Sequence, residues 1–458
     1  MEIEQLVERV DRGRLPAGIY SDPEVHRLER ERLFPRTWQY MAHVSEIPDP
    51  GDYVVRRIVD DSFIVVRGND GVVRVLLNMC RHRGMQVCRA EAGTTGHFRC
   101  PYHAWTYRNT GELAAVPFHA DAYGGDAGLD RSRAGLVPAP RTEIHRGMIF
   151  SSLDPDAAPL REAMGGFDFY LDLYVHHSES GMEVRGPQRW VIQSNWKIGA
   201  ENFSGDSYHT PHTHVSVVEI GLFLEPKAHR RKEGALYWAG SGGGTTYKLP
   251  TRDFRENLAH IGYPPEMVER MGRLWSPEQQ ALVGRAGFMP SASTLFPNLS
   301  LVHNWPRVRE GEGVVPFVSI RLWQPIGPTE TEVLSWFAVD AEAPQWYKDD
   351  SYRAYLLCFG SSGMFEQDDV ENWTSITSVS RGSFAAGVEL DNTMGMAPGG
   401  GTLHEPVAGW PGPGSAFVGY GEYNQRELLR RWGRLLRGEA APGLHAAAAA
   451  PVGLTVAG

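Results

Sequence analysis

Histidines and cysteines with the spacing of metal ligands occur in two parts of this sequence. The first part contains two short motifs, CRH at residues 80–82 and CPYH at residues 100–103, with seventeen residues between them. The second part is NWKIGAENFSGDSYHTPHTH, residues 195–214, which contains three histidines and Asp206. Thiolate, imidazole and carboxylate groups bind transition metals, so both parts predict metal sites.

The first two motifs offer two thiolates and two imidazoles, from Cys80, His82, Cys100 and His103. A [2Fe–2S] cluster held by two Cys and two His is a Rieske cluster, whose potential is raised because neutral imidazoles replace two thiolates. A structural zinc site uses the same donors, but zinc fingers usually pair CxxC with HxxxH. Here each motif supplies one Cys and one His, which favours the Rieske cluster over zinc.

The second part predicts a mononuclear iron, because two imidazoles and one carboxylate leave half of an octahedral Fe(II) open for oxygen and substrate. His209, His212 and His214 compete for the two imidazole positions. Spacing favours His209 with His212, one helical turn apart, but Pro211 must disturb a helix at this point. Four candidates for the carboxylate lie far downstream, namely Glu366, Asp368, Asp369 and Glu371.

The composition is that of a globular protein with a sizeable core. The 458 residues predict two or three domains, and 42% of them are hydrophobic. A net charge of -10 argues against nucleic-acid and anionic-membrane partners. Four cysteines form no disulfide framework, the first residues carry no apolar signal core, and no run reaches the ~18 apolar residues of a membrane span. We therefore expect a soluble cytoplasmic protein.

The first third of the chain predicts a helical segment followed by a small all-β domain. Residues 1–37 are expected to be helical, with Ser21 and Glu24 as a capping box and an end near Pro35. Short β-rich runs follow from Tyr53 to about residue 154, and Asn-Asp-Gly at residues 69–71 predicts a hairpin. Both Cys–His motifs fall in this domain. A polar, Pro-containing patch at residues 154–159 marks its end.

The remainder mixes helices with an antiparallel sheet. Gly-rich residues 240–244 predict a flexible break after a basic tetrad at 229–232, which is either a surface loop or an active-site lid. Strands are expected at 189–193, 293–304, 317–326 and 332–340, and helices at 160–175, 252–285, 344–378 and 422–437. The fold class is α+β. The expected domains are 1–37, joining the catalytic domain; 38–155, for the cluster; 156–440, for the mononuclear iron; and 441–458, a flexible tail.

Residues 80–107, CRHRGMQVCRAEAGTTGHFRCPYHAWTY, resemble the Rieske motif of the aromatic-ring-hydroxylating dioxygenases, in their large (alpha) subunit. Ala104 stands where that family usually has Gly, and would be strained if its φ is positive. Trp105 is expected to pack over the cluster loop or in the core. The resemblance extends over nearly the whole chain and implies a helix-grip sheet in the catalytic domain.

Residues 201–214 match the family pattern EN-x3-D-x2-H-x4-H, and FEQDDVENW resembles the segment whose second Asp binds iron. The resemblance therefore implies His209, His214 and Asp369 as iron ligands, and leaves Asp368 as a helix cap or a solvated carboxylate. It implies that Asp206 orients His209 and reaches a cluster histidine of a neighbouring subunit. Asn202 is expected to line the site.

The implied activity is dihydroxylation of an aromatic ring to a cis-dihydrodiol. Electrons would come from NAD(P)H through a reductase and a ferredoxin, and the assembly would be a trimer, with a small beta subunit in an α3β3 complex. Alternatives are a Rieske monooxygenase or demethylase, and an electron-transfer or ligand-binding protein. Five arginines that surround the cluster ligands would dock the ferredoxin or bind backbone carbonyls in the cluster loops, namely Arg81, Arg83, Arg89, Arg99 and Arg108.

The substrate is the least determined feature. By their positions in the matching segments, four residues are expected to line the pocket, although ordinary core positions would explain the aromatic ones as well: Phe203, Ser207, Phe359 and Phe365. Aromatic walls suit a mono- or polycyclic arene. Arg307 and Arg309 could instead bind a carboxylate, as in phthalate or salicylate.

Overall fold

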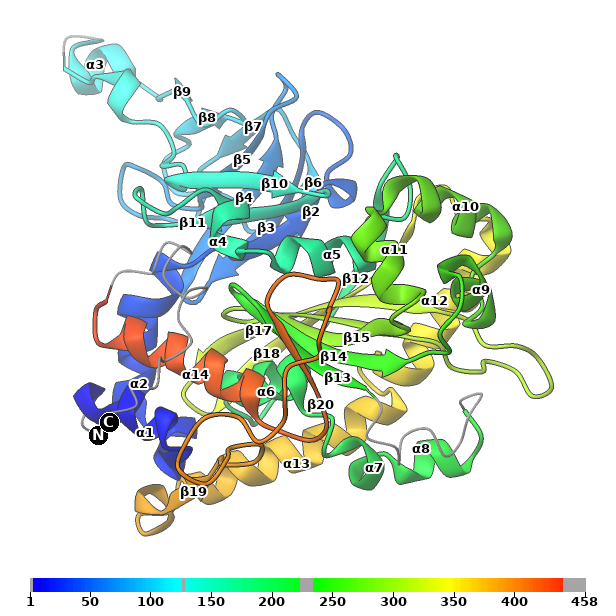
Figure 1. Cartoon of the computed structure of the whole chain (residues 1–458). Helices are drawn as coiled ribbons and strands as arrows, with labels where there is room; N and C mark the ends of the chain where they lie inside the picture. Colours follow the sequence, from blue (N-terminus) through cyan, green and yellow to red (C-terminus); the bar gives the residue numbers. More distant parts are fainter. Residues whose placement is uncertain (1–2, 126–127, 223–233, 440–458) are drawn as a thin grey trace, which may run out of the picture. The chain divides into compact units, whose positions relative to one another are not determined.

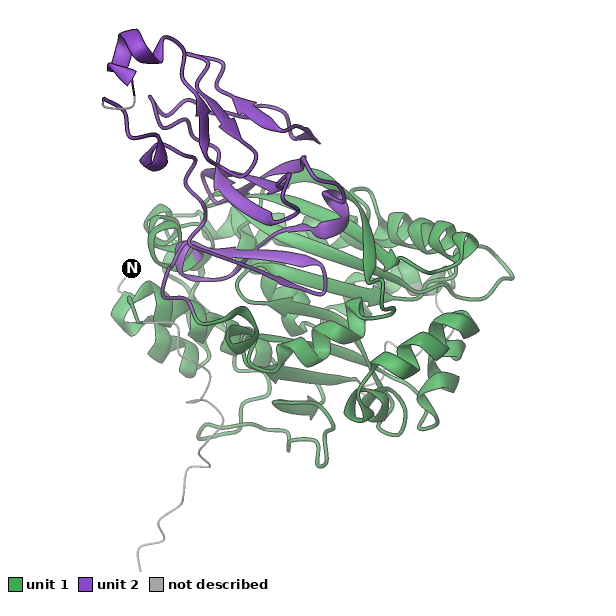
Figure 2. Cartoon of the chain, turned by 90° about the horizontal axis from the view of Figure 1, so that it is seen from above, with its two compact units in different colours: residues 1–33, 158–458 green, residues 34–157 purple. Residues whose placement is uncertain are grey.

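The computed structural model describes residues 3–125, 128–222 and 234–439. These form two compact units, one made of residues 1–33 and 158–458 and the other of residues 34–157 (Figure 2). The basic tetrad at 229–232 and the predicted tail at 441–458 lie outside the described residues. Among the described helices, none has both the length and the apolar content needed to cross a membrane.

The regular structure of the smaller unit is mostly short antiparallel strands joined by loops. Its sheets have the orders β10-β11-β2, β5-β4-β3-β6 and β7-β8-β9. The elements are β2 (Gln39–His43), β3 (Asp52–Ile58), β4 (Asp61–Arg67), β5 (Val73–Leu77), β6 (Ala92–Thr94), β7 (His97–Arg99), β8 (Thr106–Arg108), β9 (Leu113–Ala115), α3 (His119–Tyr123), β10 (Arg141–His145) and β11 (Met148–Ser152).

The predicted hairpin between β4 and β5 is confirmed. Gly71 has φ +79, which favours glycine, and the Asp70 carboxylate accepts a hydrogen bond from the Val72 N–H at 3.1 Å. The first Cys–His motif follows β5, and the second lies in the connection between β7 and β8. Both motifs border one buried core, which contains Leu76, Phe98 and Trp105.

The larger unit is a sheet with helices packed on it. Its elements are α1 (Leu6–Asp11), β1 (Arg14–Pro16), α2 (Pro23–Leu28), α4 (Leu160–Met164), α5 (Phe167–Val175), β12 (Met182–Ile192), α6 (Trp196–Gly205), α7 (Thr210–Thr213), α8 (Val215–Glu219), β13 (Ala235–Ala239), β14 (Gly242–Lys248), α9 (Phe254–His260), α10 (Pro265–Leu274), α11 (Pro277–Val283), β15 (Phe288–Leu295), β16 (Leu299–Asn304), β17 (Phe317–Gly327), β18 (Glu330–Asp340), α12 (Gln345–Phe359), α13 (Met364–Ser380), β19 (Glu389–Asp391), β20 (Ser415–Val418) and α14 (Tyr423–Leu436).

The sheet is antiparallel, with eight strands in the order β12-β18-β17-β16-β15-β14-β13-β20. Helix α6 packs on β14 to β17, and α14 packs on α6 (Figure 1). The side chain of Asn195 caps α6 by accepting a hydrogen bond from the Lys197 N–H at 3.1 Å. The α+β class and the antiparallel sheet agree with the sequence-based expectation.

The N-terminal segment is mostly helical as predicted, with helical turns at 3–11, 17–20 and 23–36, but a short strand interrupts it. Residues Arg14–Pro16 form β1, which pairs with β19 from the far end of the chain. The expected capping box at Ser21 is wrong, because Asp22 caps α2 by accepting a hydrogen bond from the Glu24 N–H at 2.8 Å. The Ser21 hydroxyl instead donates to the Ser380 carbonyl at 2.9 Å, so this serine ties the N-terminal segment to α13.

The flexible break predicted at residues 240–244 is also wrong. Residues 242–244 begin β14, an internal strand between β13 and β15. A Cβ added at Gly242 would collide with the Phe167 ring, and one at Gly244 would collide with the Ala292 carbonyl. The glycines therefore allow close packing across the sheet, which a Gly-rich sequence does not distinguish from a flexible linker.

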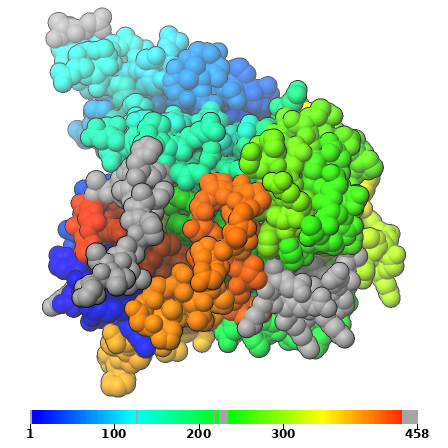
Figure 3. All heavy atoms as spheres, in the orientation of Figure 1, coloured from blue at the N-terminus to red at the C-terminus, as the bar shows by residue number. Residues whose placement is uncertain are grey.

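Three predicted helical ranges are each interrupted, and 252–285 is divided into α9, α10 and α11. Helix 160–175 is divided into α4 and α5 at Gly165 and Gly166, which have φ +59 and φ +95. Helix 344–378 is divided into α12 and α13 at residues 360–363. The chain after α13, coloured orange, then crosses the surface between the blue N-terminal segment and the green segment of α9 to α11 (Figure 3).

Candidate metal centres

The two Cys–His motifs form loops with the same backbone hydrogen bonds. In the first, the Cys80 N–H donates to the Met85 carbonyl at 2.8 Å, and the Gly84 N–H donates to the Cys80 carbonyl at 2.9 Å. In the second, the Cys100 N–H donates to the Trp105 carbonyl at 2.8 Å, and the Ala104 N–H donates to the Cys100 carbonyl at 3.0 Å. Each loop is therefore closed by bonds within six residues.

The fourth residue after each cysteine has left-handed backbone. Gly84 has φ +74 in the first loop, and Ala104 has φ +57 in the second. An L-residue with a Cβ is disfavoured there, whereas glycine is not. Ala104 is thus strained at the position where the resembling family usually has Gly.

The four side chains of these motifs lie together and fit a Rieske cluster. Cys80 and Cys100 are buried, and their thiols contact each other. The rings of His82 and His103 lie with centroids 4.6 Å apart. His82 Nδ1 is buried and has no hydrogen-bond partner among the described residues, as expected of a nitrogen that binds iron. Trp105 stacks on His82 at 5.2 Å, which confirms its packing over the cluster loop.

Two other features of this unit bear on the cluster. Cys88 is buried, and its thiol donates to the Ala90 carbonyl at 3.5 Å, outside the four-residue group. The five arginines predicted to surround the ligands are all exposed, and within the described part of the chain their side chains form no ion pair: Arg81, Arg83, Arg89, Arg99 and Arg108. Their charges are therefore available to a partner.

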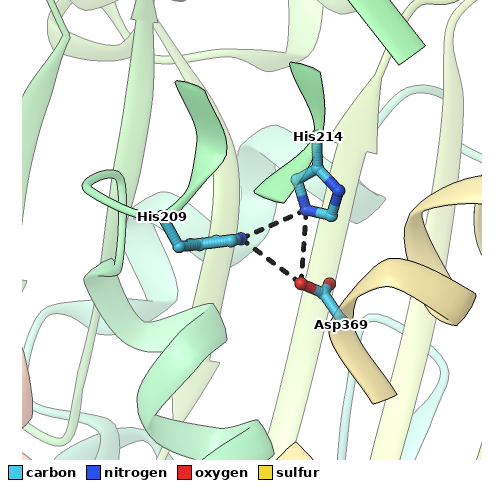
Figure 4. A group of neighbouring side chains, drawn as sticks. All are labelled: His209, His214 and Asp369. Carbon is cyan, nitrogen blue, oxygen red and sulfur yellow. Dashed lines mark hydrogen bonds and ion pairs between the residues drawn. The ribbon is translucent and has the colours of Figure 1, made fainter. Parts of the chain in front are cut away.

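The predicted iron ligands come from two distant segments. His209 directly precedes α7, His214 directly follows it, and Asp369 lies on α13. Helix α7 is a single turn with Pro211 in its first turn, so the histidines do not have the spacing of one long helix. Figure 4 shows both imidazoles and the carboxylate pointing toward one another.

The three donor atoms form a compact triangle. His209 Nε2 lies 3.2 Å from His214 Nε2 and 3.4 Å from Asp369 Oδ1, and His214 Nε2 lies 3.2 Å from Asp369 Oδ1. Ligands ~2.1 Å from a metal at right angles would be ~3 Å apart. The triangle therefore fits one face of an octahedral Fe(II).

Each histidine has a carboxylate at its other ring nitrogen. His209 Nδ1 lies 2.5 Å from the main-chain carbonyl oxygen of Asp206 and 3.4 Å from Asp206 Oδ2, and Asp368 Oδ2 lies 3.2 Å from His214 Nδ1. Carbonyl and carboxylate oxygens in this position fix the tautomer and the orientation of a metal-binding imidazole. Sequence reasoning missed the contact made by Asp368, because a carboxylate beside a ligand looks like an ordinary solvated residue.

Electrostatics couple these groups. Burial favours a low pKa for His209, but hydrogen bonds with Asp206 and Asp369 raise the pKa to about 10. Burial acts in the opposite direction on Asp369, and hydrogen bonds from His209 and His214 lower its pKa to about 2. Without metal, the site thus holds a proton on His209 beside an ionised Asp369, and a metal must displace that proton.

The remaining candidates lie outside the triangle. His212 and Glu371 are exposed, and Glu366 is buried in an ion pair with Arg321. Asn202 lies half-buried on the last turns of α6, where its carbonyl accepts a hydrogen bond from the Asp206 N–H at 3.0 Å.

Three of the four predicted pocket residues form one aromatic wall that begins at the triangle. The Phe365 ring lies 4.6 Å from His214, Phe359 stacks on Phe365 at 5.1 Å, and Phe203 lies 5.9 Å from Phe359. Ser207 lies in the turn after α6, where its N–H donates to the Gly205 carbonyl at 3.0 Å.

A buried ion pair contacts the wall, and no sequence pattern predicted it. Arg321, within the apolar strand β17, pairs with Glu366, and its Nη2 donates to the Phe359 carbonyl at 2.7 Å. Its guanidinium lies 5.1 Å from the Phe359 ring and 5.4 Å from the Phe203 ring. Glu366 lies one turn before Asp369, so the pair also anchors the helix that carries this carboxylate.

The arginines considered for a substrate carboxylate already have partners. Arg307 donates to the carbonyls of Gly221 and Glu312, at 3.0 and 3.1 Å. Arg309 forms ion pairs with Asp350 and Glu312, at 2.7 and 3.0 Å. Both guanidinium groups therefore already bind groups of this chain.

A small β unit with two Cys–His loops and a larger unit with a His2Asp group together define a Rieske-type non-haem iron oxygenase. The Rieske [2Fe–2S] domain family matches residues 37–128, and the catalytic domain of the ring-hydroxylating alpha subunit matches residues 171–391. The chain is 35% identical to the N,N-dimethyl phenylurea N-demethylase subunit alpha of Sphingobium sp. (strain YBL2), over 95% of each chain.

The chain is also 35% identical to the biphenyl 2,3-dioxygenase subunit alpha of Rhodococcus jostii (strain RHA1), over 94% of this chain and 91% of that one. Among solved structures, naphthalene 1,2-dioxygenase from Rhodococcus sp. bound to indole matches with a TM-score of 0.87 and 44% identity, over 96% of this chain and 98% of that one. The chain belongs to the family of ring-hydroxylating dioxygenase alpha subunits, which carry a Rieske [2Fe–2S] cluster and a mononuclear iron.

Proposed function

We propose that this protein is a terminal oxygenase component that adds both atoms of O2 to an aromatic ring and gives a cis-dihydrodiol. Its electrons come from NAD(P)H through a reductase and a ferredoxin. The observation that carries the proposal is the aromatic wall, which runs from His214 through Phe365 and Phe359 to Phe203. A flat apolar ring stacked on this wall lies beside the metal-binding triangle.

The geometry of each group supports the proposed ligand roles. Cys80, Cys100, His82 and His103 hold the cluster, within a domain spanning residues 38–155. His209, His214 and Asp369 hold the iron, within residues 156–440 joined by 1–37. When bound, the iron supplies the oxygen-activating chemistry, while Asp206 and Asp368 orient the imidazoles that hold it, and Asn202 lines the site.

The proposed substrate is a neutral mono- or polycyclic arene. The side chains nearest the triangle are buried aromatic rings, an apolar environment that suits such a ring, and the similar naphthalene 1,2-dioxygenase structure has indole bound. An aromatic carboxylate such as phthalate or salicylate has less support, because Arg307 and Arg309 already bind other groups.

The proposed partners are a ferredoxin, further copies of this chain and a small beta subunit. Five exposed arginines around the cluster loops give a positive surface in a chain of net charge -10, which suits an acidic electron carrier. In a trimer, Asp206 would contact His103 of the partner subunit and link the cluster of one chain to the iron of the next. Asp206→Ala should then stop turnover even when both metal sites are loaded, and normal turnover would contradict this role.

A second candidate function is oxidative N-demethylation. It is favoured by the 35% identity, over 95% of each chain, to an N,N-dimethyl phenylurea N-demethylase subunit alpha. The same two metal centres would serve this reaction, but one oxygen atom would enter the methyl group and leave as formaldehyde.

A single turnover in labelled O2 separates the two. The chemically reduced protein is mixed with ¹⁸O2 and naphthalene, biphenyl, phenanthrene, phthalate or N,N-dimethylphenylurea, and products are analysed by mass spectrometry. Two labelled atoms in one diol establish ring dioxygenation. Formaldehyde from the urea, without labelled diol from any arene, would replace the proposal with N-demethylation.

A matched pair of variants tests the iron ligands within the same assay. His209→Ala should abolish product while the visible cluster absorption stays, because the cluster ligands lie in the other unit. His212→Ala, three residues away and exposed, should retain product. Product from His209→Ala would show that the mononuclear site is misassigned.

A further inference from the structure

One guanidinium bridges the break between two helices of the larger unit. Phe359 is the last residue of α12, and after residues 360–363 the chain begins α13, which carries Glu366 and Asp369. The Arg321 Nη2 group donates to the Phe359 carbonyl at 2.7 Å, and the Nη1 group pairs with Glu366 Oε2. The end of α12 and the first turn of α13 are therefore held by the same side chain.

The guanidinium supplies a donor where a helix lacks one. The last carbonyls of a helix have no partner within it, and a buried carbonyl without a donor costs free energy comparable to a lost hydrogen bond. Phe359 is buried, and positive charge is also favoured at the C-terminal end of a helix. Loss of the guanidinium should therefore move the end of α12, together with the Phe359 ring.

The guanidinium is itself fixed in position. The Arg321 side chain is fully buried. Its guanidinium lies between 5.1 and 5.6 Å from four ring centroids, those of Trp190, Phe203, Trp323 and Phe359. The Trp190 indole N–H donates to the other oxygen of Glu366, at 3.2 Å. The planar fork of an arginine holds two acceptors at a set separation, which the single ammonium of a lysine does not.

We propose that Arg321 is a positioning residue that determines which bond of a bound arene is oxidised. It acts through Phe359, whose ring stacks on Phe365 at 5.1 Å. Phe365 in turn lies 4.6 Å from His214, so a shift of the Phe359 ring changes the space beside the metal-binding triangle. The inference rests on the proposed function, because it concerns the selectivity of that reaction.

Phenanthrene tests this role because it can give several regioisomeric dihydrodiols, whose ratio reports how the arene lies at the iron. Single turnovers of the chemically reduced protein compare the wild type with Arg321→Lys and with the charge-free double variant Arg321→Met with Glu366→Leu. Neither variant leaves a buried charge unpaired, so both should retain iron. A ratio of products does not depend on the fraction of the protein that holds iron, so incomplete loading does not alter it.

Both variants should change the product ratio although both retain iron. The lysine has one nitrogen and cannot hold both groups in the native geometry, and the methionine donates nothing. The ratio should change at least about threefold in each, because a small displacement of the wall changes two activation barriers unequally. In a Phe359→Leu background, Arg321→Lys should have little further effect, because the residue through which it acts is gone.

A second measurement does not depend on turnover. 4-Fluorophenylalanine at position 359 labels the ring, and its ¹⁹F NMR resonance is recorded in chelator-treated protein without substrate. The resonance should move in Arg321→Lys and in the charge-free double variant, because the end of α12 has lost its donor.

Another buried ion pair of the same unit provides the matched control. Arg270 Nη2, on α10, pairs with Asp340 Oδ2 of β18 at 2.9 Å and donates to the Glu342 carbonyl at 3.2 Å. Arg270→Met with Asp340→Asn removes this pair, and the asparagine keeps an oxygen for the Glu342 N–H. The product ratio and the fluorine resonance should both remain those of the wild type.

An unchanged product ratio in Arg321→Lys and in the double variant would overturn the inference, as would an unchanged fluorine resonance. An equal change in the Arg270 variant, or a full effect of Arg321→Lys in the Phe359→Leu background, would also contradict it. If the wild type gives no diol from any arene, the proposed function fails instead, and the fluorine resonance still tests whether Arg321 positions Phe359.

Discussion

The two metal centres of this protein are built in different ways. The proposed cluster ligands lie within residues 80–103, on two loops that each close on themselves through backbone hydrogen bonds. The proposed iron ligands come from residues 209–214 and from Asp369, more than 150 residues later. Asp369 reaches the histidines only because α13 is held in place by buried contacts such as that between Arg321 and Glu366.

The cluster site therefore depends on local backbone structure, whereas the iron site depends on tertiary contacts. Changes in the sheet or in α13 should empty the iron site and leave the cluster intact, whereas changes in a cluster loop should act on the cluster alone. The contacts that matter are also different. Backbone geometry controls the loops, and buried charges control the position of Asp369.

The largest effect is expected from Arg321→Met, which tests tertiary control. It leaves Glu366 buried without its cation, and breaking a buried pair in this way costs about 3–5 kcal/mol. We expect a lower denaturant midpoint for the larger unit and loss of iron from the purified protein, with cluster absorption retained. The measurements are circular dichroism in urea and iron per chain after exposure to a chelator.

Two controls sharpen this comparison. The double variant Arg321→Met with Glu366→Leu removes both charges and should recover most of the stability and iron. Arg309→Met breaks a more exposed pair with Asp350 and should change the unfolding free energy by less than about 1 kcal/mol. Equal losses in Arg309→Met and Arg321→Met would contradict the argument from burial.

A pH dependence should distinguish the iron site from the cluster. The pKa of His209 is raised to about 10 and that of Asp369 is lowered to about 2, so from pH 8 to pH 6 the metal-free site carries a proton on His209 and an ionised carboxylate. Iron must displace that proton, so its apparent affinity should fall about tenfold for each unit of decreasing pH, or about 100-fold across this range.

The measurement is Fe(II) binding to chelator-treated protein at pH 6, 7 and 8, with cluster absorption as the internal reference. Asp206→Asn removes one of the groups that raise the pKa of His209, so the affinity for Fe(II) should depend less steeply on pH in this variant. An affinity that does not change between pH 6 and 8 in the parent protein would contradict the proton displacement.

Asp368→Asn should weaken iron binding by about 10–100-fold, the usual effect of losing a group that orients a metal ligand. Asn can still fill the space 3.2 Å from His214 Nδ1, so the fold should be unchanged. Glu371→Gln, on the same helix but exposed, is the matched control and should bind iron normally. If both variants bind as the parent does, Asp368 is only a solvated carboxylate.

Sequence reasoning found the cluster because its ligands and their spacing are local. It did not find the iron ligands unaided, since the spacing favoured His209 with His212, and only the resemblance pointed to His214. The one-turn helix around Pro211 explains why. The ion pair of Arg321 was not predicted, because the sequence does not show which side chain lies beside a charged residue of an apolar strand in the folded chain.

The fold shows the same limit. The antiparallel strands and the hairpin before Gly71 follow from alternation and turn residues, and both were predicted. The glycines from Gly242 to Gly244 were misread as a flexible linker because their role depends on the Phe167 ring and the Ala292 carbonyl, which come from other parts of the chain. Residue type alone does not distinguish a flexible glycine segment from a closely packed one.

The smallest effect concerns the cluster loops, and tests whether backbone geometry alone controls them. Gly84 and Ala104 occupy the same left-handed position, with φ +74 and φ +57. Ala104→Gly should relieve strain and stabilise the loop by about 1 kcal/mol, and Gly84→Ala should destabilise the other loop by about 1–2 kcal/mol. The readout is the urea concentration at which half of the visible cluster absorption is lost.

Space is not the reason for the expected loss in Gly84→Ala. A Cβ at Gly84 would meet only the Met79 sulfur, at 4.0 Å, so any destabilisation reports the backbone conformation itself. Iron in the larger unit should be unaffected by either change. Shifts of the urea midpoint in opposite directions in the two variants would show that the two loops have equivalent backbones and differ by one methyl group. An unchanged midpoint in Gly84→Ala would mean that the backbone hydrogen bonds of Cys80 tolerate another conformation.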